Sequence, residues 1–170
     1  MLHLSALDQS PVRSGGSPAD AVQETLRLAQ TVEQLGYRRF WLAEHHGTDG
    51  FAGSAPEILV TRVAAATYDI RVGSGGVMLS HYSPLKVAET FRLLELLYPG
   101  RIDLGIGRAP GSDPRTARAL AYGSQVGIEY FPARIADLVA FLEDSAPATE
   151  AFSGVRATPK TPSIPEVWLL

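Results

Sequence analysis

The chain has no cysteine among its 170 residues, which excludes disulfide bonds, thiolate nucleophiles and cysteine-ligated metal centres. No uninterrupted apolar run approaches the roughly 20 residues that a membrane-spanning helix needs. Neither sign of charge dominates, since the formal net charge is −3 at pH 7, and there is no basic cluster of the kind that binds nucleic acid. The first residues lack the basic and apolar regions of a secretory signal. These absences favour a cytoplasmic protein with neither a membrane nor a nucleic acid as partner.

What the chain does contain is a regular alternation of strand-like and helix-like segments. Apolar runs of strand type begin near residues 3, 38, 70 and 102, so successive strands start about 32 to 35 residues apart. A (β/α)8 barrel of about 250 residues has roughly 31 residues per unit. The same spacing also fits a doubly wound open sheet. The period therefore predicts an α/β fold and leaves both architectures open.

Helix start signals lie between these strands. Ser17 is a suitable N-cap before a proline and an acidic residue, and Gly36 ends the apolar periodicity that follows. Ser54 with Glu57 predicts a second start with a capping-box acid, and its helix extends to about residue 67. Ser83 precedes a third helix, whose expected apolar stripe is formed by Val87, Phe91, Leu94 and Leu97.

The alternation of strand-like and helix-like segments becomes less regular in the last third of the chain. A segment with glycine and proline extends to about residue 127, and a fourth helix is expected to bury Ile135, Leu138, Val139 and Leu142. Residues 145–165 have no clear period and are expected to form a long loop. Residues 166–170 are apolar and indicate a fifth strand.

Four βα units and one strand make about half of an eight-fold barrel. A half-barrel leaves two strand edges unpaired and part of its core exposed. We therefore expect residues 1–170 to be a fragment truncated at its C-terminus, or to pair with another copy. A complete small open sheet is the alternative.

Three short motifs occur at matching places in successive strand–helix repeats. They are Glu44-His45-His46, Gly75-Gly76 and Gly107-Arg108-Ala109-Pro110-Gly111. The carboxyl ends of parallel strands gather on one face, and ligands bind there. The sequence thus predicts that a histidine pair, a glycine pair and an arginine line one pocket. His81-Tyr82 lies just past the third strand and could reach the same side.

Each motif has two interpretations: a role in chemistry or ligand binding, and a purely structural role. Histidine suits proton transfer near neutral pH, but two adjacent loop histidines can also be without function. Adjacent histidines point in different directions, so a shared metal site is not favoured. Gly75-Gly76 allows close approach of a flat ligand or marks a β-bulge or tight packing. Arg108 can grip a phosphate through two parallel hydrogen bonds or form a surface salt bridge.

At residues 44–46, 73–79 and 99–108 the chain resembles the bacterial luciferase-like flavin monooxygenases, most closely their single-component oxidoreductase branch. The likeness starts near Leu4 and extends to the last residue, with the segments in the same order and spacing. It implies a TIM-type (β/α)8 barrel that binds FMN. Because family members usually have well over 300 residues, residues 1–170 correspond to the N-terminal half of the barrel.

The resemblance also implies roles for the first motif. The first histidine of the family's pair is catalytic, which assigns to His45 the handling of a proton near the reacting oxygen. Glu44 and His46 would orient His45 or hold its loop.

For the cofactor, the resemblance implies that Gly75 and Gly76 are joined by a non-proline cis peptide beneath the isoalloxazine ring. Arg108 would contact the flavin phosphate. Ala109 and Pro110 would flank the flavin, Pro110 only sterically or through its carbonyl, because proline has no amide hydrogen.

The implied activity is a monooxygenase reaction. Reduced FMN from a separate flavin reductase would react with O2, and a small organic, aldehyde-like substrate would take one oxygen atom. A homodimer is expected. The alternatives are a deazaflavin (F420)-dependent oxidoreductase on the same barrel, a non-catalytic flavin-binding or partner subunit, and a metal-dependent barrel hydrolase.

Overall fold

The computed structural model describes residues 2–109, 112–123 and 127–170. Its centre is one parallel sheet whose strands follow the order β1-β2-β3-β4-β5. The expected strands are all present, with small shifts of their ends. Their bounds are Ser5–Asp8 (β1), Arg39–Leu42 (β2), Arg71–Met78 (β3), Ile102–Gly107 (β4) and Glu166–Leu169 (β5).

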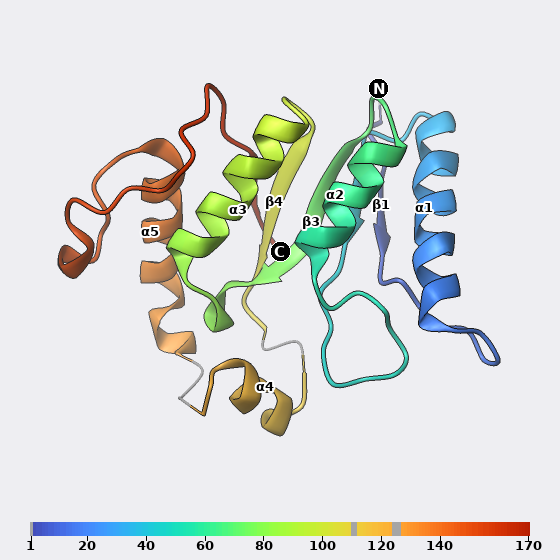
Figure 1. Cartoon of the computed structure of the whole chain (residues 1–170), viewed down its shortest axis with the longest axis horizontal. Helices are drawn as coiled ribbons and strands as arrows, with labels where there is room; N and C mark the ends of the chain where they lie inside the picture. Colours follow the sequence, from blue (N-terminus) through green and yellow to red (C-terminus); the bar gives the residue numbers. More distant parts are fainter. Residues whose placement is uncertain (1, 110–111, 124–126) are drawn as a thin grey trace.

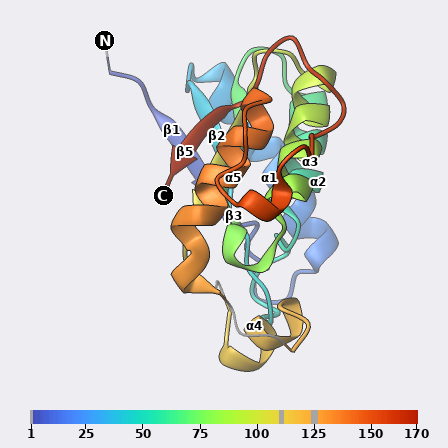
Figure 2. The same ribbon diagram turned by 90° about the vertical axis from the view of Figure 1, so that its left-hand side faces the viewer.

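Helices α1, α2, α3 and α5 cover one side of this sheet, and α4 lies apart, beyond the carboxyl ends of the strands (Figures 1 and 2). The strand order follows the chain without reversal. A doubly wound sheet reverses its order and has helices on both faces, so this arrangement is that of a partial (β/α) barrel. The α-helices span Pro18–Gln34 (α1), Pro56–Ala66 (α2), Pro84–Leu97 (α3), Pro114–Leu120 (α4) and Phe131–Glu143 (α5), and 3-10 turns span Leu79–His81 (η1), Ile128–Tyr130 (η2) and Glu150–Phe152 (η3).

The hydrophobic core lies between the sheet and these helices. Alternate strand residues point into it because side chains along a strand alternate between its two faces. Fully buried examples are Phe40, Val72 and Leu104 from the strands, which belong to one cluster with Val60 and Leu138 from the helices. This packing fixes where the carboxyl ends of the strands lie.

The opposite face of the sheet carries a layer of charged side chains. Asp103 is buried and accepts hydrogen bonds from Arg39 and Arg71, and Arg39 also contacts Glu166 at 2.6 Å. The Trp168 ring lies 4.7 Å from the Arg39 guanidinium. The layer ties β2, β3, β4 and β5 together near their starts.

The helix starts follow the sequence signals in two of three cases. Ser17 caps α1 as expected and also forms a capping box with Asp20, and Ser83 caps α3. The expectation that Ser54 caps α2 is wrong. The helix begins at Pro56, so the N-cap position falls to Ala55, which has no side-chain oxygen to accept a hydrogen bond.

Helix α4 was not anticipated. It is short, and Ala117 is its one buried residue, so it has no apolar stripe for a periodicity argument to detect. Its signal is local: Asp113 accepts hydrogen bonds from the backbone N–H groups of Arg115 and Thr116. The predicted stripe of α3 also ends one turn early, since Leu97 is 55% exposed at the last position of the helix.

Glu33 on α1 makes the fold sensitive to acid. One of its carboxylate oxygens accepts three backbone hydrogen bonds, from Tyr68, Asp69 and Ile70, at 2.8 to 3.0 Å. Burial alone would raise the pKa of Glu33, but these bonds outweigh it and lower the pKa below its ordinary value of 4.5. The stabilisation is therefore complete above the ordinary pKa and is lost as the pH falls through the lowered, folded-state pKa.

We expect Glu33→Gln to lower the free energy of unfolding by about 1 kcal/mol at pH 7, because the amide oxygen keeps the hydrogen bonds without the charge. In urea titrations the difference from the unmodified chain should shrink below pH 4. Glu129→Gln is the control, since Glu129 is exposed. An equal loss at pH 7 and at pH 3 would contradict the assignment.

Candidate functional site

The predicted residues converge on one cavity at the carboxyl ends of β2, β3 and β4. Its volume is about 690 Å³, within the range of roughly 300–1,000 Å³ typical of small-molecule sites. All three predicted motifs contribute to its wall. The lining residues are Ala43, Glu44, His45, Gly75, Gly76, Met78, Gly107, Arg108, Ala109, Ile128 and Leu170.

His45 is held in place by a backbone hydrogen bond and a ring contact, and one of its ring nitrogens has no hydrogen-bond partner among the described residues. Its N–H donates to the carbonyl of Gly53 at 2.9 Å, and its ring packs against Phe51 with centroids 4.8 Å apart. Nδ1 of His45 is buried and has no hydrogen-bond partner within the described part of the chain. A buried polar atom without a partner is rare in folded proteins. Because Nδ1 has almost no accessible surface, other atoms of His45 form its part of the cavity wall.

His46 does not line the cavity, contrary to the expectation that both histidines would. Its Nε2 lies 2.9 Å from a carboxylate oxygen of Glu44, which turns the ring behind the cavity wall. Glu44 is buried, with its side chain only 1% exposed, and also accepts hydrogen bonds from the Met78 N–H at 2.9 Å and the Tyr82 hydroxyl at 2.5 Å. Adjacent residues in an extended segment point in opposite directions, and this separates the two histidines.

The glycine pair in β3 is joined by a cis peptide bond, as the resemblance implies. The register between β3 and β4 shifts between Ser74 and Val77. This agrees with the alternative interpretation of the glycine pair as a β-bulge. A Cβ on Gly76 would lie 2.8 to 2.9 Å from backbone atoms of Gly105 and Gly107. Tight packing alone therefore requires glycine at position 76, and the same backbone forms part of the cavity wall.

Arg108 and Ala109 follow β4 and are exposed at the cavity mouth. The guanidinium of Arg108 makes neither a hydrogen bond nor a salt bridge to another described residue. No residue in the described ranges therefore forms a salt bridge with Arg108, and the positive charge of Arg108 is available to an anion. Pro110, also expected beside the flavin, lies outside the described residues.

Some lining residues were not anticipated. Leu170 follows β5, so the rule of strand ends could have found it. Ile128 belongs to η2, which has no sequence signal linking it to the site. Met78 is the last residue of β3, and an apolar side chain at that position is ordinarily assigned to the hydrophobic core.

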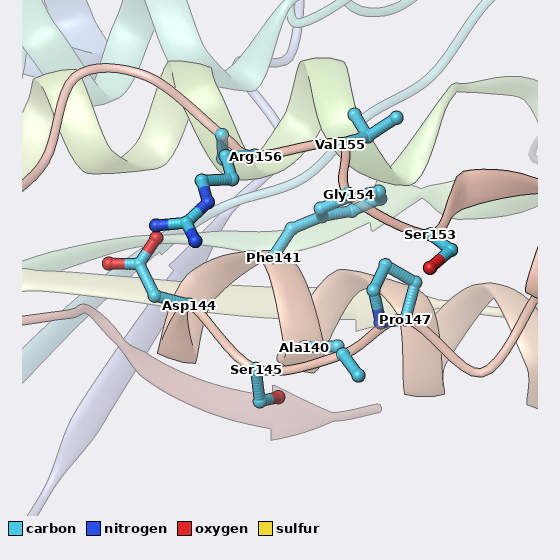
Figure 3. Close-up of a pocket in the computed structure, with 11 residues that line it drawn as sticks. Ala140, Phe141, Asp144, Ser145, Pro147, Ser153, Gly154, Val155 and Arg156 are labelled. Atoms are coloured by element: carbon cyan, nitrogen blue, oxygen red, sulfur yellow. The ribbon is translucent and has the colours of Figure 1, made fainter.

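A second cavity of about 240 Å³ lies away from these motifs, between the end of α5 and the loop that follows it (Figure 3). The side chains of Asp144 and Arg156 point toward one another across it. None of the residues predicted from sequence lines it, and it is remote from the strand ends. We therefore assign the functional site to the larger cavity.

The described residues form neither a candidate metal site nor a membrane-spanning helix. Within residues 2–109, 112–123 and 127–170, no group of three or more histidine, aspartate or glutamate side chains is placed to hold a metal ion. No helix in the same ranges has both the length and the apolar character to span a membrane.

Comparison with known proteins gives matches over the whole chain. A family model described as luciferase-like monooxygenase matches residues 1–169. Protein YceB of Bacillus subtilis is 52% identical over 170 residues, which cover 100% of this chain and 51% of the relative. N-acetyl-S-alkylcysteine monooxygenase of the same organism is 46% identical with the same coverage. The chain spans about half the length of the curated relatives it matches.

Solved structures agree with the partial barrel. The crystal structure of apo-MsnO8 superposes with a TM-score of 0.89 at 44% identity, covering 99% of this chain and 49% of the other. The oxygenating constituent of a Pseudomonas putida 3,6-diketocamphane monooxygenase, in complex with FMN, has a TM-score of 0.69 at 19% identity, covering 85% and 40%. An F420-dependent secondary alcohol dehydrogenase has a TM-score of 0.57 at 16% identity, covering 98% and 51%. The last two likenesses establish the fold alone.

Proposed function

The chain belongs to the luciferase-like monooxygenase family, and from that premise we propose that it holds FMN in the cavity at its strand ends and serves an FMN-dependent monooxygenase reaction. One observation carries the proposal: His45, a glycine-walled surface and an arginine with neither a hydrogen bond nor a salt bridge to another described residue meet in one cavity of about 690 Å³. FMN joins a phosphate to a flat, polar-edged ring, so the arginine suits the phosphate and the glycine backbone suits the ring.

The residues present fit this cofactor. Arg108 would hold the phosphate, since a guanidinium can grip two phosphate oxygens with parallel hydrogen bonds. The backbone of Gly75 and Gly76 would lie against the ring, because no side chain keeps a planar ligand away from it. Ala109 would flank the cofactor beside Arg108. Bound reduced FMN would supply the electrons that reduce O2.

The proton chemistry falls to the chain itself. His45, which lines the cavity, would hold or release a proton at its imidazole ring. Its backbone bond to Gly53 and its contact with Phe51 keep the ring in place. Glu44 adds a buried carboxyl group beside His46. A histidine whose ring is held in place at the cavity wall is suited to act as a general acid or base toward a bound substrate.

The substrate we propose is a small organic molecule that takes one oxygen atom, for which an aldehyde is the expectation from the resemblance. One relative carries N-acetyl-S-alkylcysteine in its name, so a thioether-containing acid is a second substrate class to assay. We propose a separate flavin reductase as the source of reduced FMN and a homodimer as the working assembly.

The first test is a fluorescence titration of the chain with FMN. We expect micromolar binding and a roughly tenfold or greater loss of affinity in Arg108→Ala, because a charged hydrogen-bond pair to the phosphate is removed. Arg118→Ala is the control, since Arg118 is exposed on α4 and does not line the cavity. Equal affinities for the unmodified chain and for Arg108→Ala would remove Arg108 from the phosphate site.

The same titration separates the remaining alternatives. Preferential binding of F420 would favour hydride transfer on the same barrel. His45→Asn then distinguishes an enzyme from a binding subunit: we expect retained FMN binding with lost turnover. Turnover that is unchanged in His45→Asn would contradict the catalytic role of His45.

A further inference from the structure

Tyr82 connects the turn after β3 to the histidine motif. It follows η1, and its ring packs partly buried against the hydrophobic core. Its hydroxyl donates to a carboxylate oxygen of Glu44 at 2.5 Å and lies 3.5 Å from Nε2 of His46. The same Glu44 oxygen lies 2.9 Å from that Nε2. Tyr82 and His46 therefore meet on one oxygen atom.

The chemistry of Glu44 fixes the direction of these bonds. An ionised carboxylate only accepts hydrogen bonds, so both the Tyr82 hydroxyl and Nε2 of His46 are donors. The second oxygen of Glu44 is held by the Met78 N–H at 2.9 Å. With its proton on Nε2, a neutral His46 ring keeps its lone pair on Nδ1.

Tyr82 is suited to remain the donor in this cluster. Burial, and next the hydrogen bond to Glu44, raise the pKa of Tyr82 well above its ordinary value of 10.0, and the charges of Glu44 and Glu57 act in the same direction. The hydroxyl therefore stays protonated at neutral pH. A phenylalanine would keep the packing of the ring and lose only the oxygen.

We propose that Tyr82 is a positioning residue of the cavity: its hydroxyl holds the Glu44 carboxylate in the orientation that keeps the proton of His46 on Nε2. The relevance of this arrangement to catalysis rests on the proposed function. The arrangement itself does not require FMN. Without the hydroxyl, Glu44 is anchored on the opposite oxygen by Met78 alone, and the carboxylate is free to turn away from His46.

The test is nitrogen NMR of the flavin-free chain labelled with 15N in its four histidines, at a pH where the rings are neutral. The signals of His46 are assigned by their loss in His46→Asn. In the unmodified chain we expect Nε2 to be the protonated nitrogen. In Tyr82→Phe we expect the ratio of the Nε2-protonated to the Nδ1-protonated form to fall roughly tenfold, as one charged hydrogen bond is lost.

Two further variants sharpen the result. Tyr98→Phe is the matched control, because Tyr98 is also partly buried against the core and its hydroxyl makes no hydrogen bond within the described part of the chain. It should leave the ratio unchanged. Glu44→Gln should lower the ratio at least as much as Tyr82→Phe. A shift in Glu44→Gln with none in Tyr82→Phe, or an equal shift in Tyr98→Phe, would overturn the proposal.

A second measurement does not depend on how well Tyr82→Phe folds. A hydroxyl proton in so short a bond to a buried carboxylate should give a far-downfield, slowly exchanging 1H signal in the unmodified chain. That signal should disappear in Glu44→Gln, and its absence from the unmodified chain would also overturn the proposal. Because both measurements use the flavin-free chain, a failure to bind FMN would contradict the proposed function and leave this test intact.

Discussion

Arg92→Ala should lower the free energy of unfolding by about 3 to 5 kcal/mol, because several buried backbone carbonyls lose a charged hydrogen-bond donor. Arg92 lies on α3, and its side chain is only 1% exposed. Its guanidinium donates to four backbone carbonyls and contacts the carboxylate of one aspartate at 3.1 Å. These partners are Phe141, Leu142, Ala157, Pro159 and Asp144.

The placement of these partners explains the size of the effect. The carbonyls of Phe141 and Leu142 lie at the end of α5, where the helix dipole places partial negative charge. The carbonyls of Ala157 and Pro159 belong to the loop that leads to β5. A single side chain therefore holds α3, α5 and this loop together, and truncation removes the donor from the buried carbonyls of Phe141, Leu142 and Ala157.

Urea titrations of the unmodified chain and the variant measure the difference. Arg62→Ala is the matched control, because Arg62 is an exposed arginine on α2 and its loss should change stability by no more than about 0.5 kcal/mol. Arg92→Lys should recover only part of the loss, because an ammonium group lacks the fork of donors. Equal stabilities for Arg92→Ala and Arg62→Ala would show that the carbonyls find other partners.

Arg92 also forms long-range contacts that the sequence alone does not predict. The apolar stripe expected for α3 contains Phe91 and Leu94, and a charged residue between them would ordinarily be placed in solvent. Its partners are 49 to 67 residues further along the chain. Only the tertiary arrangement brings them together, so local periodicity carries no sign of this bond. The same holds for Tyr82 and Glu44, which are 38 residues apart.

The parts that could be predicted follow from local chemistry or from a general rule of parallel sheets. Strand positions and the N-cap at Ser17 depend on nearby residues alone. The gathering of His45, Gly75 and Arg108 on one cavity follows because the carboxyl ends of parallel strands share an edge. The rule does not say which way each side chain turns, and His46 was misplaced for that reason.

Gly105→Ala is expected to cost about 3 kcal/mol or more, because the added methyl group overlaps the backbone of the neighbouring strand. A Cβ on Gly105 would fall well inside contact distance of the Ser74 carbonyl oxygen and 3.0 Å from the Leu170 side chain. A backbone atom cannot turn away as a side chain can. To accept the methyl group, β3 and β4 would have to separate beside the cavity.

Gly107 provides a control two residues further along the same strand, on the same face. A Cβ there would find its nearest neighbours, the carbonyl oxygens of Gly76 and Val77, at ordinary contact distances of 3.7 and 3.8 Å. Gly107→Ala should therefore keep its stability within about 0.5 kcal/mol of the unmodified chain. Urea titrations of the two variants form the test, and a Gly105→Ala chain as stable as Gly107→Ala would mean that β3 and β4 are less closely packed than described. If the difference is found, steric packing against β3 suffices to account for glycine at position 105, and position 107, which lines the cavity, is the one left open to a ligand-based explanation.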